Sequence, residues 1–186
     1  MNVRPFPQSF FDRPTLDVAR ELLGARLAIR DATGRIRRQA IVEVEAYDGP
    51  DDLASHASRG PTERNAPMFG PPGHWYVYLC YGMHWMLNVV TGPVGYPAAV
   101  LIRGLEDISG PARLTRQLGI DRRFDSLVAN RHVGLWIEAG PAVPDAETQR
   151  LPRIGVDYAG DWAARPYRLV VSSRTVEKMG KKTHKA

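Results

Sequence analysis

The chain has 186 residues, and its 25 Lys and Arg against 20 Asp and Glu give a net charge of +5 and a pI near 9.6. This length suits one domain with a real hydrophobic core, and 44% apolar with 24% charged residues is ordinary for a soluble globular protein. The single cysteine, Cys80, excludes an intrachain disulfide, and there is no apolar leader or run of about 18 apolar residues. We expect a cytoplasmic protein that enters no membrane, with a basic charge that suits a polyanionic partner such as nucleic acid.

The first part of the chain predicts an arm, a helix and a β-hairpin. Residues 1–11 are rich in Pro and Phe and indicate an irregular arm. Asp12 is a suitable N-cap for a helix that ends before Gly24. The segment 25–30 then predicts a strand, and after a Gly-containing turn the segment 35–47 predicts a long returning strand.

The end of this long strand, with the sequence IVEVEAY, places two carboxylates on one surface. Strand alternation predicts one core-like apolar face and an opposite face that carries Ile41, Glu43, Glu45 and Tyr47. Glutamates two positions apart on a strand lie roughly 7 Å apart. Because like charges this close disfavour joint ionisation, one of the two glutamates needs a nearby cation or a raised pKa.

The middle of the chain predicts a long polar loop followed by a second hairpin. The loop runs from 48 to 72, and a loop of this length inside a compact domain usually has a function. Strands are predicted at 75–81 and 84–90 from their aromatic and β-branched content. Gly82 can take the positive φ that the tight turn between them requires.

The remaining elements complete a predicted α+β fold. A strand at 98–105 carries Arg103, and a helix begins near Ser109 and stops at Gly119. The later predictions are a helical turn within 122–131, strands at 134–139, 154–157 and 167–171, a loop at 141–152, and a basic, disordered tail at 178–186. Hairpins outnumber βαβ units, so we expect residues 1–186 to form a single mixed domain, with a mainly antiparallel sheet, surrounding helices and a protruding hairpin.

Several kinds of site are disfavoured by the spacing of the polar residues. His56, His74, Cys80 and His84 have no close-paired spacing of the kind that zinc ligands show, so we expect no metal. The sequence also lacks a Walker A loop, a G-x-S-x-G elbow and a dinucleotide-binding fingerprint. The remaining candidates for a site are Glu45, Arg103, His56 and the four tyrosines Tyr47, Tyr76, Tyr78 and Tyr81. Such tyrosines can stack on a nucleobase, although Tyr76 also suits the core of the sheet.

These residues lie in motifs that resemble the alkyladenine (3-methyladenine) DNA glycosylase family. The resemblance runs in order from about residue 10 to 172, and its motifs are Val42–Tyr47, Ser55–His56, Arg59–Phe69, Tyr76–Met83, Asn88, Arg103, Gly110–Leu114 and Arg153–Trp162. One departure is His84, where we associate the family with a tyrosine.

The resemblance implies an enzyme that flips damaged purines out of duplex DNA and hydrolyses the N-glycosidic bond without metal or cofactor. The implied substrates are 3-methyladenine, 7-methylguanine, hypoxanthine and ethenoadenine. The implied residue roles are Glu45 and Arg103 in catalysis, Tyr47, His56, Tyr78 and Asn88 in binding the base, and Tyr81 and Met83 in intercalation. Apart from the resemblance, we expect the basic residues Arg59, Arg64 and His84 to bind phosphates. A monomer acting on double-stranded DNA, with no strand cleavage, is expected.

Elementary chemistry agrees with these roles. The glycosidic bond breaks through a cation-like sugar, so a carboxylate beside it lowers the barrier and can take a proton from water. Glu45 must then be ionised near neutral pH, and we expect Arg103 to keep its pKa low against Glu43. Two other hypotheses remain open: a non-catalytic module that binds distorted or damaged DNA, and a zinc-dependent nucleobase deaminase.

Overall fold

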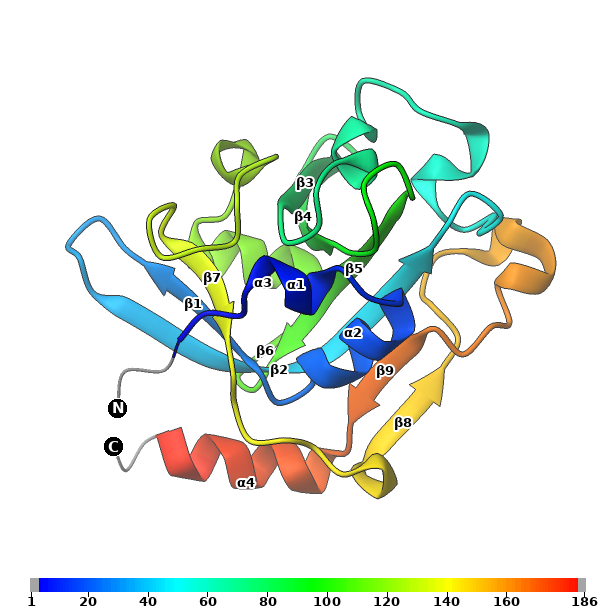
Figure 1. The fold of residues 1–186 in the computed structure, drawn as a ribbon. Coiled ribbons are helices and arrows are strands. Elements are labelled where there is room, and N and C mark those ends of the chain that lie inside the picture. Colours follow the sequence, from blue (N-terminus) through cyan, green and yellow to red (C-terminus); the bar gives the residue numbers. More distant parts are fainter. Residues whose placement is uncertain (1–3, 184–186) are drawn as a thin grey trace.

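The computed structural model describes residues 4–183. Its central element is the long strand β2 (Ile36–Asp48), as Figure 1 shows. The first half of β2 pairs with β1 (Arg26–Arg30), and its second half pairs with β5 (Ala98–Leu105) and β9 (Arg168–Val171). All pairings are antiparallel, and the order of the main sheet is β3-β4-β5-β2-β1-β7. The predicted α+β class with a mainly antiparallel sheet is therefore confirmed.

The other elements agree with most of the predicted boundaries. The helices are α1 (Gln8–Phe11), α2 (Thr15–Leu22), α3 (Pro111–Leu118) and α4 (Ser173–Thr183), and short 3-10 turns lie at His56–Arg59, Ala66–Phe69, Arg122–Phe124, Asp145–Glu147 and Asp157–Trp162. The remaining strands are β3 (Trp75–Cys80), β4 (His84–Val90), β6 (Ile108–Ser109), β7 (Leu135–Glu138) and β8 (Thr148–Leu151).

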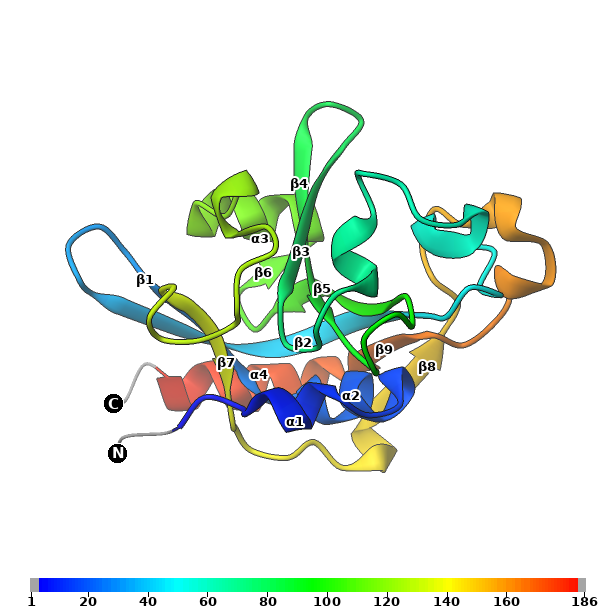
Figure 2. The same cartoon turned by 45° about the horizontal axis from the view of Figure 1, so that its top comes forward.

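Figure 2 shows the layers of the molecule, with helices α1, α2 and α4 below the sheet and the β3–β4 hairpin standing out on the opposite side. Helix α2 packs on β2 and β5, and α3 packs on β4 and β5. None of the helices in residues 4–183 combines the length and the apolarity that crossing a bilayer requires.

Strand β2 contains an irregularity that changes which residues are buried. Its register against β5 shifts on both sides of Glu43, as a β-bulge does. Ile41 therefore joins Val44 and Ala46 in the main core, although alternation placed it on the face of the glutamates. That face is itself covered, because Ala57, Met68 and Tyr76 form a second apolar cluster over it. Glu45 is fully buried as a result.

Four local predictions are wrong, two at the N-terminal side and two in the late segment. The arm contains the short helix α1, and Asp12 follows it, so that Pro14 and not Asp12 occupies the cap position of α2. The segment 154–157 is not a strand, because Gly155 has a φ of +75° and the Ile154 N–H bonds to a side chain instead of a neighbouring strand. The observed strand in this region is β8, which lies earlier, within the predicted loop 141–152, and pairs with β9.

The basic tail is also more ordered than its composition suggests. Helix α4 extends to Thr183, where a disordered tail from Lys178 was predicted, and the rest of that tail, residues 184–186, lies outside the described residues, as does the start of the predicted arm, residues 1–3. Val176 and Met179, three positions apart on one helical face, pack against the main core. This apolar contact stabilises a helix whose other residues are largely polar.

Candidate active site

A cavity of about 570 Å³ opens beside the second half of β2. This volume lies within the roughly 300–1,000 Å³ that is usual for small-molecule sites. Its walls come from β3, β4 and β5, from the polar loop after β2, and from the segment after β8. The lining residues include Tyr47, Ala54, His56, Arg64, Met68, Tyr76, Tyr78, Cys80, Tyr81, Met86, Asn88, Leu101, Arg103, Pro111, Ile154, Val156 and Tyr158.

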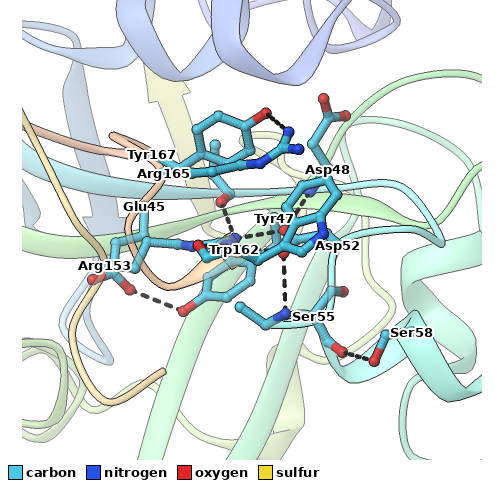
Figure 3. A network of polar contacts seen from close by, with 12 residues as sticks. Glu45, Tyr47, Asp48, Asp52, Ser55, Ser58, Arg153, Trp162, Arg165 and Tyr167 are labelled. Atoms are coloured by element: carbon cyan, nitrogen blue, oxygen red, sulfur yellow. Dashed lines mark hydrogen bonds and ion pairs between the residues drawn. The ribbon is translucent and has the colours of Figure 1, made fainter. Parts of the chain in front are cut away.

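Glu45 lies immediately behind this cavity and is held by three of its lining residues (Figure 3 shows part of the network). The Tyr47 hydroxyl donates to Glu45 Oε2 at 2.9 Å, and the backbone N–H of Ile154 donates to Oε1 at 2.8 Å. Nη1 of Arg103 lies 3.3 Å from Oε2. The carboxylate is thus fixed in one orientation at the base of the cavity.

Arg103 links both glutamates of β2. Its Nε donates to Glu43 Oε1 at 3.1 Å, while Nη1 pairs with Glu45. Arg168 of β9 supplies a second cation to Glu43 at 3.0 Å. The sequence prediction of two close carboxylates that need a cation is met here by two arginines, one of which contacts both carboxylates.

The pKa of Glu45 differs in direction from the prediction. Burial raises it above the ordinary value for a glutamate, and this effect outweighs the opposing effects of Arg103, the Ile154 N–H and the Tyr47 hydroxyl. The expectation that Arg103 keeps this pKa low is therefore wrong in its net direction. The sequence pattern showed the cation but not the complete loss of solvent around the carboxylate.

Three aromatic rings line one side of the cavity in contact with one another. The rings of His56 and Tyr78 meet edge to face at 4.6 Å, and those of Tyr76 and Tyr78 lie 5.1 Å apart. Nδ1 of His56 lies 3.1 Å from the Tyr76 hydroxyl. Burial, followed by the charge of Arg64, lowers the pKa of His56, while burial raises those of Tyr76 and Tyr78. Near neutral pH these rings are uncharged, and Tyr76 belongs both to the core and to the cavity wall.

Asn88 lies on the neighbouring strand β4 and is almost fully buried. Its side-chain amide donates to the Tyr76 carbonyl at 3.0 Å. This bond orients the side chain, and Asn88 still lines the cavity.

Tyr81 and Met83 stand at the tip of the protruding β3–β4 hairpin. Tyr81 is 86% exposed and Met83 is 71% exposed, and Tyr81 also lines the mouth of the cavity. Tyr81 has a φ of +50° and Gly82 one of +68°, so a non-glycine residue adopts a left-handed conformation here. The turn thereby holds a large aromatic side chain in solvent next to the cavity.

The three predicted phosphate ligands lie on the surface, and only one of them lines the cavity. Arg64 donates from Nη2 to the Leu79 carbonyl at 2.8 Å, and its guanidinium lies 5.4 Å from the centre of the Tyr78 ring. His84 begins β4 beside the hairpin tip, and Arg59 ends a 3-10 turn in the polar loop. Both are exposed.

Two residues of this region escaped the sequence analysis as site residues. Asp52 and Arg153 form an ion pair with both side chains fully buried, and Arg153 directly precedes the residue that donates to Glu45. Arg153 was visible only as part of a motif, and Asp52 only as one of several acids in a polar loop. Within residues 4–183, no group of three or more His, Cys, Asp or Glu side chains gathers as metal ligands do.

Comparison with known proteins identifies the family of the chain. A model of the family described as methylpurine-DNA glycosylase matches residues 9–109 and 106–175. A protein of Anaeromyxobacter dehalogenans named "Putative 3-methyladenine DNA glycosylase" is 51% identical over 173 residues, which is 89% of this chain and 82% of the relative. Relatives with the same name in Myxococcus xanthus and Methanocella arvoryzae are 49% and 47% identical, over 89% and 88% of this chain and 89% and 90% of their own lengths. The chain therefore belongs to the methylpurine-DNA glycosylase family.

Proposed function

We propose that this protein excises alkylated or deaminated purines from double-stranded DNA by hydrolysing the N-glycosidic bond, with Glu45 as the general base. The observation that carries the proposal is the position of Glu45, a buried carboxylate whose three partners all line a cavity walled by tyrosines. Substrates of the class of 3-methyladenine, 7-methylguanine, hypoxanthine and ethenoadenine are proposed from the family and from the ring-lined cavity.

In the proposed reaction, a water molecule attacks C1′ of the flipped nucleotide. The bond from the water oxygen to C1′ forms, the bond from C1′ to the purine nitrogen breaks, and the bonding electrons leave with the base. Glu45 takes the proton of the water, and its negative charge stabilises the cation-like sugar. The products are an abasic site and the free base: a cationic alkylated purine leaves as a neutral base, a neutral purine takes up a proton from solvent, and Glu45 returns its proton to solvent.

The carboxylate of Glu45 has a free acceptor position that this role requires. A carboxylate has about four acceptor positions, and the Tyr47 hydroxyl and the Ile154 N–H occupy two of them, while Arg103 forms an ion pair with Oε2. A free acceptor position can accept from a water. Arg103 lies between Glu43 and Glu45, where its charge favours the ionised form that a general base needs.

The cavity walls suit a damaged purine for a second reason. Alkylated purines carry a positive charge, and electron-rich tyrosine faces attract cations by about 0.5–2 kcal/mol. Tyr47, His56 and Tyr78 are proposed to hold the flipped base, with Asn88 at the edge where the amino group of guanine would lie. Stacking at about 1–3 kcal/mol per base helps to offset the cost of flipping.

Outside the cavity, Tyr81 and Met83 are proposed to enter the duplex and fill the gap that the flipped base leaves. Their exposure and their place at the hairpin tip support this role. Arg59, Arg64 and His84 are proposed to contact phosphates, which fix the register of the protein on the duplex.

We propose a single hydrolytic activity without strand cleavage and without metal or cofactor. None of the described residues that line the cavity is a lysine, whose amine could form a Schiff base with the sugar. A carboxylate and water are sufficient for the chemistry. We further propose that the protein acts as an intracellular monomer on duplex DNA.

The test is release of free base from duplexes that each carry one of the four lesions, measured by chromatography alongside the abasic product. We expect release by the wild-type protein and strand cleavage only after alkali. Glu45→Gln should bind the lesion duplex but release little base. Binding of damaged duplex without release by the wild type would instead support a non-catalytic damage-binding module, and stoichiometric zinc with a deaminated base as product would support a deaminase.

A further inference from the structure

Arg153 is the most thoroughly enclosed cation beside the cavity. Its side chain is 0% exposed, and so is that of its partner Asp52, 101 residues away in the chain. The pair is bidentate, with Nη2 2.7 Å from Oδ1 and Nη1 2.5 Å from Oδ2. Because a buried ion pair is costly to desolvate and often adds little stability, its presence next to a site calls for another explanation.

The pair joins the backbone segments that meet beside Glu45. Arg153 Nη1 also donates to the carbonyl of Ala46, the residue between Glu45 and Tyr47. Asp52 accepts from the backbone N–H of Asp48 at 3.1 Å and from that of Ala54 at 3.1 Å. The end of β2, the start of the polar loop and the segment after β8 are thus joined at one point (Figure 3).

Both non-arginine donors to Glu45 depend on this junction. The Ile154 N–H, which donates to Oε1, belongs to the residue that follows Arg153. The Tyr47 ring, whose hydroxyl donates to Oε2, lies 4.9 Å from the Arg153 guanidinium, which also lies 5.2 Å from the Tyr167 ring. Movement of Arg153 would therefore shift both donors at once.

We propose that the Arg153–Asp52 pair is a positioning device for the general base, which holds the Tyr47 hydroxyl and the Ile154 N–H on the two oxygens of Glu45. This inference rests on the proposed hydrolysis. Because Asp52 balances the charge of Arg153, the pair acts through geometry more than through net charge. Neither residue lines the cavity, so neither is expected to touch the substrate.

The pair also has a consequence for pH dependence. The charged and titratable groups that face Glu45 are Arg103 from β5, Tyr47 and Glu43 from β2, Tyr78 from β3, and Arg153 from the segment after β8. Hydrogen bonds from the Ile154 N–H and the Tyr47 hydroxyl lower the pKa of Glu45. If the pair is loosened, these bonds weaken, the pKa of Glu45 rises further, and the acidic limb of the rate profile moves to higher pH.

The test compares Arg153→Lys, which keeps the charge but cannot bind Asp52 through two nitrogens, with the wild-type protein. We expect single-turnover base release at saturating enzyme to fall by roughly 10- to 100-fold, as small misplacements of a catalytic group do. We also expect the acidic limb to move to higher pH, with affinity for lesion duplex unchanged. Asp52→Asn should lower the rate as well, whereas the charge of Arg153 that it leaves unbalanced opposes the shift of the limb to higher pH.

Arg20→Lys is the matched control, because Arg20 likewise joins a distant carboxylate, Asp145, to a backbone carbonyl, that of Val143, but lies on α2 away from the cavity. Its rate and pH profile should equal those of the wild type. The inference would be overturned if Arg153→Lys and Asp52→Asn both released base at the wild-type rate and with the wild-type pH profile. Failure of both to fold while Arg20→Lys folds would also overturn it, because the pair would then only support the fold. Absence of base release by the wild type would instead refute the proposed function.

Discussion

Two buried glutamates, one on the central strand β2 and one on β7 at the end of the main sheet, show what separates a candidate site from a structural ion pair. Glu45 on β2 and Glu138 on β7 are both 0% exposed, and each forms an ion pair with an arginine and accepts a hydrogen bond from an aromatic side chain. Glu138 receives Arg38 Nε at 2.7 Å and the indole N–H of Trp136 at 2.9 Å. By composition the two environments are nearly equivalent.

The difference lies in where the partners themselves point. Tyr47, Arg103 and Ile154, which hold Glu45, all line the tyrosine-walled cavity, whereas neither Arg38 nor Trp136 does. Burial alone therefore does not mark a functional carboxylate. What distinguishes Glu45 is that all three of these partners face one cavity walled by tyrosine rings. Of the two partners of Glu138 named here, Arg38 lines a different cavity, of about 630 Å³, whose described lining residues include no aromatic ring.

The largest expected effect is on the rate of base release. Glu45→Gln removes the group that accepts a proton from water, an effect worth about 10²–10⁴ in rate. Glu138→Gln should leave the rate per folded molecule within about twofold of the wild type. Single-turnover assays on a lesion duplex measure both. Equal losses in the two variants would mean that the two regions differ less in function than their geometry suggests.

A smaller effect is expected on stability, and here Glu138→Gln should lose more than Glu45→Gln. Glu138→Gln leaves buried donors without full partners, which costs about 1–3 kcal/mol in the free energy of unfolding. Glu45→Gln should cost less, because it also removes a carboxylate whose ionised form burial disfavours. Urea unfolding at neutral pH compares them. A larger loss in Glu45→Gln would indicate that Glu45 mainly stabilises the fold.

The smallest expected effect is a displacement of the pH profile. Because the pKa of Glu45 is raised above the ordinary value of 4.5, base release should fall, as pH decreases, through an apparent pKa above 4.5. The sign for stability is the reverse. The folded state retains the Glu45 proton to higher pH than the unfolded state, so the contribution of Glu45 to stability decreases as pH rises from the ordinary value of 4.5 through the raised pKa.

The rate profile is measured with the wild type, and the stability profile is measured as the difference between the wild type and Glu45→Gln across the same pH range. A rate limb at or below the ordinary value would show that the donors around Glu45 outweigh its burial.

Much of this architecture could be predicted from local sequence. The bounds of β4 and β5 follow from their β-branched and aromatic residues, and the hairpin tip follows from Gly82 between two such runs. The approach of two carboxylates follows from the spacing of Glu43 and Glu45 alone. Alternation, turn residues and charge are local properties, so the chain carries them whatever its partners are.

Other features depend on contacts between distant segments. The bulge in β2 that buries Ile41 depends on the pairing of β2 with β5. Strand β8 forms because it pairs with β9. The residues after β8 leave the sheet, and the Ile154 N–H donates to Glu45. The raised pKa of Glu45 and the Asp52–Arg153 pair arise only when loops far apart in sequence exclude water from the same place. The sequence alone determined which groups were available and along which strands they lie. Only the tertiary structure decided which of them are desolvated together, because burial is a property of the packed chain as a whole.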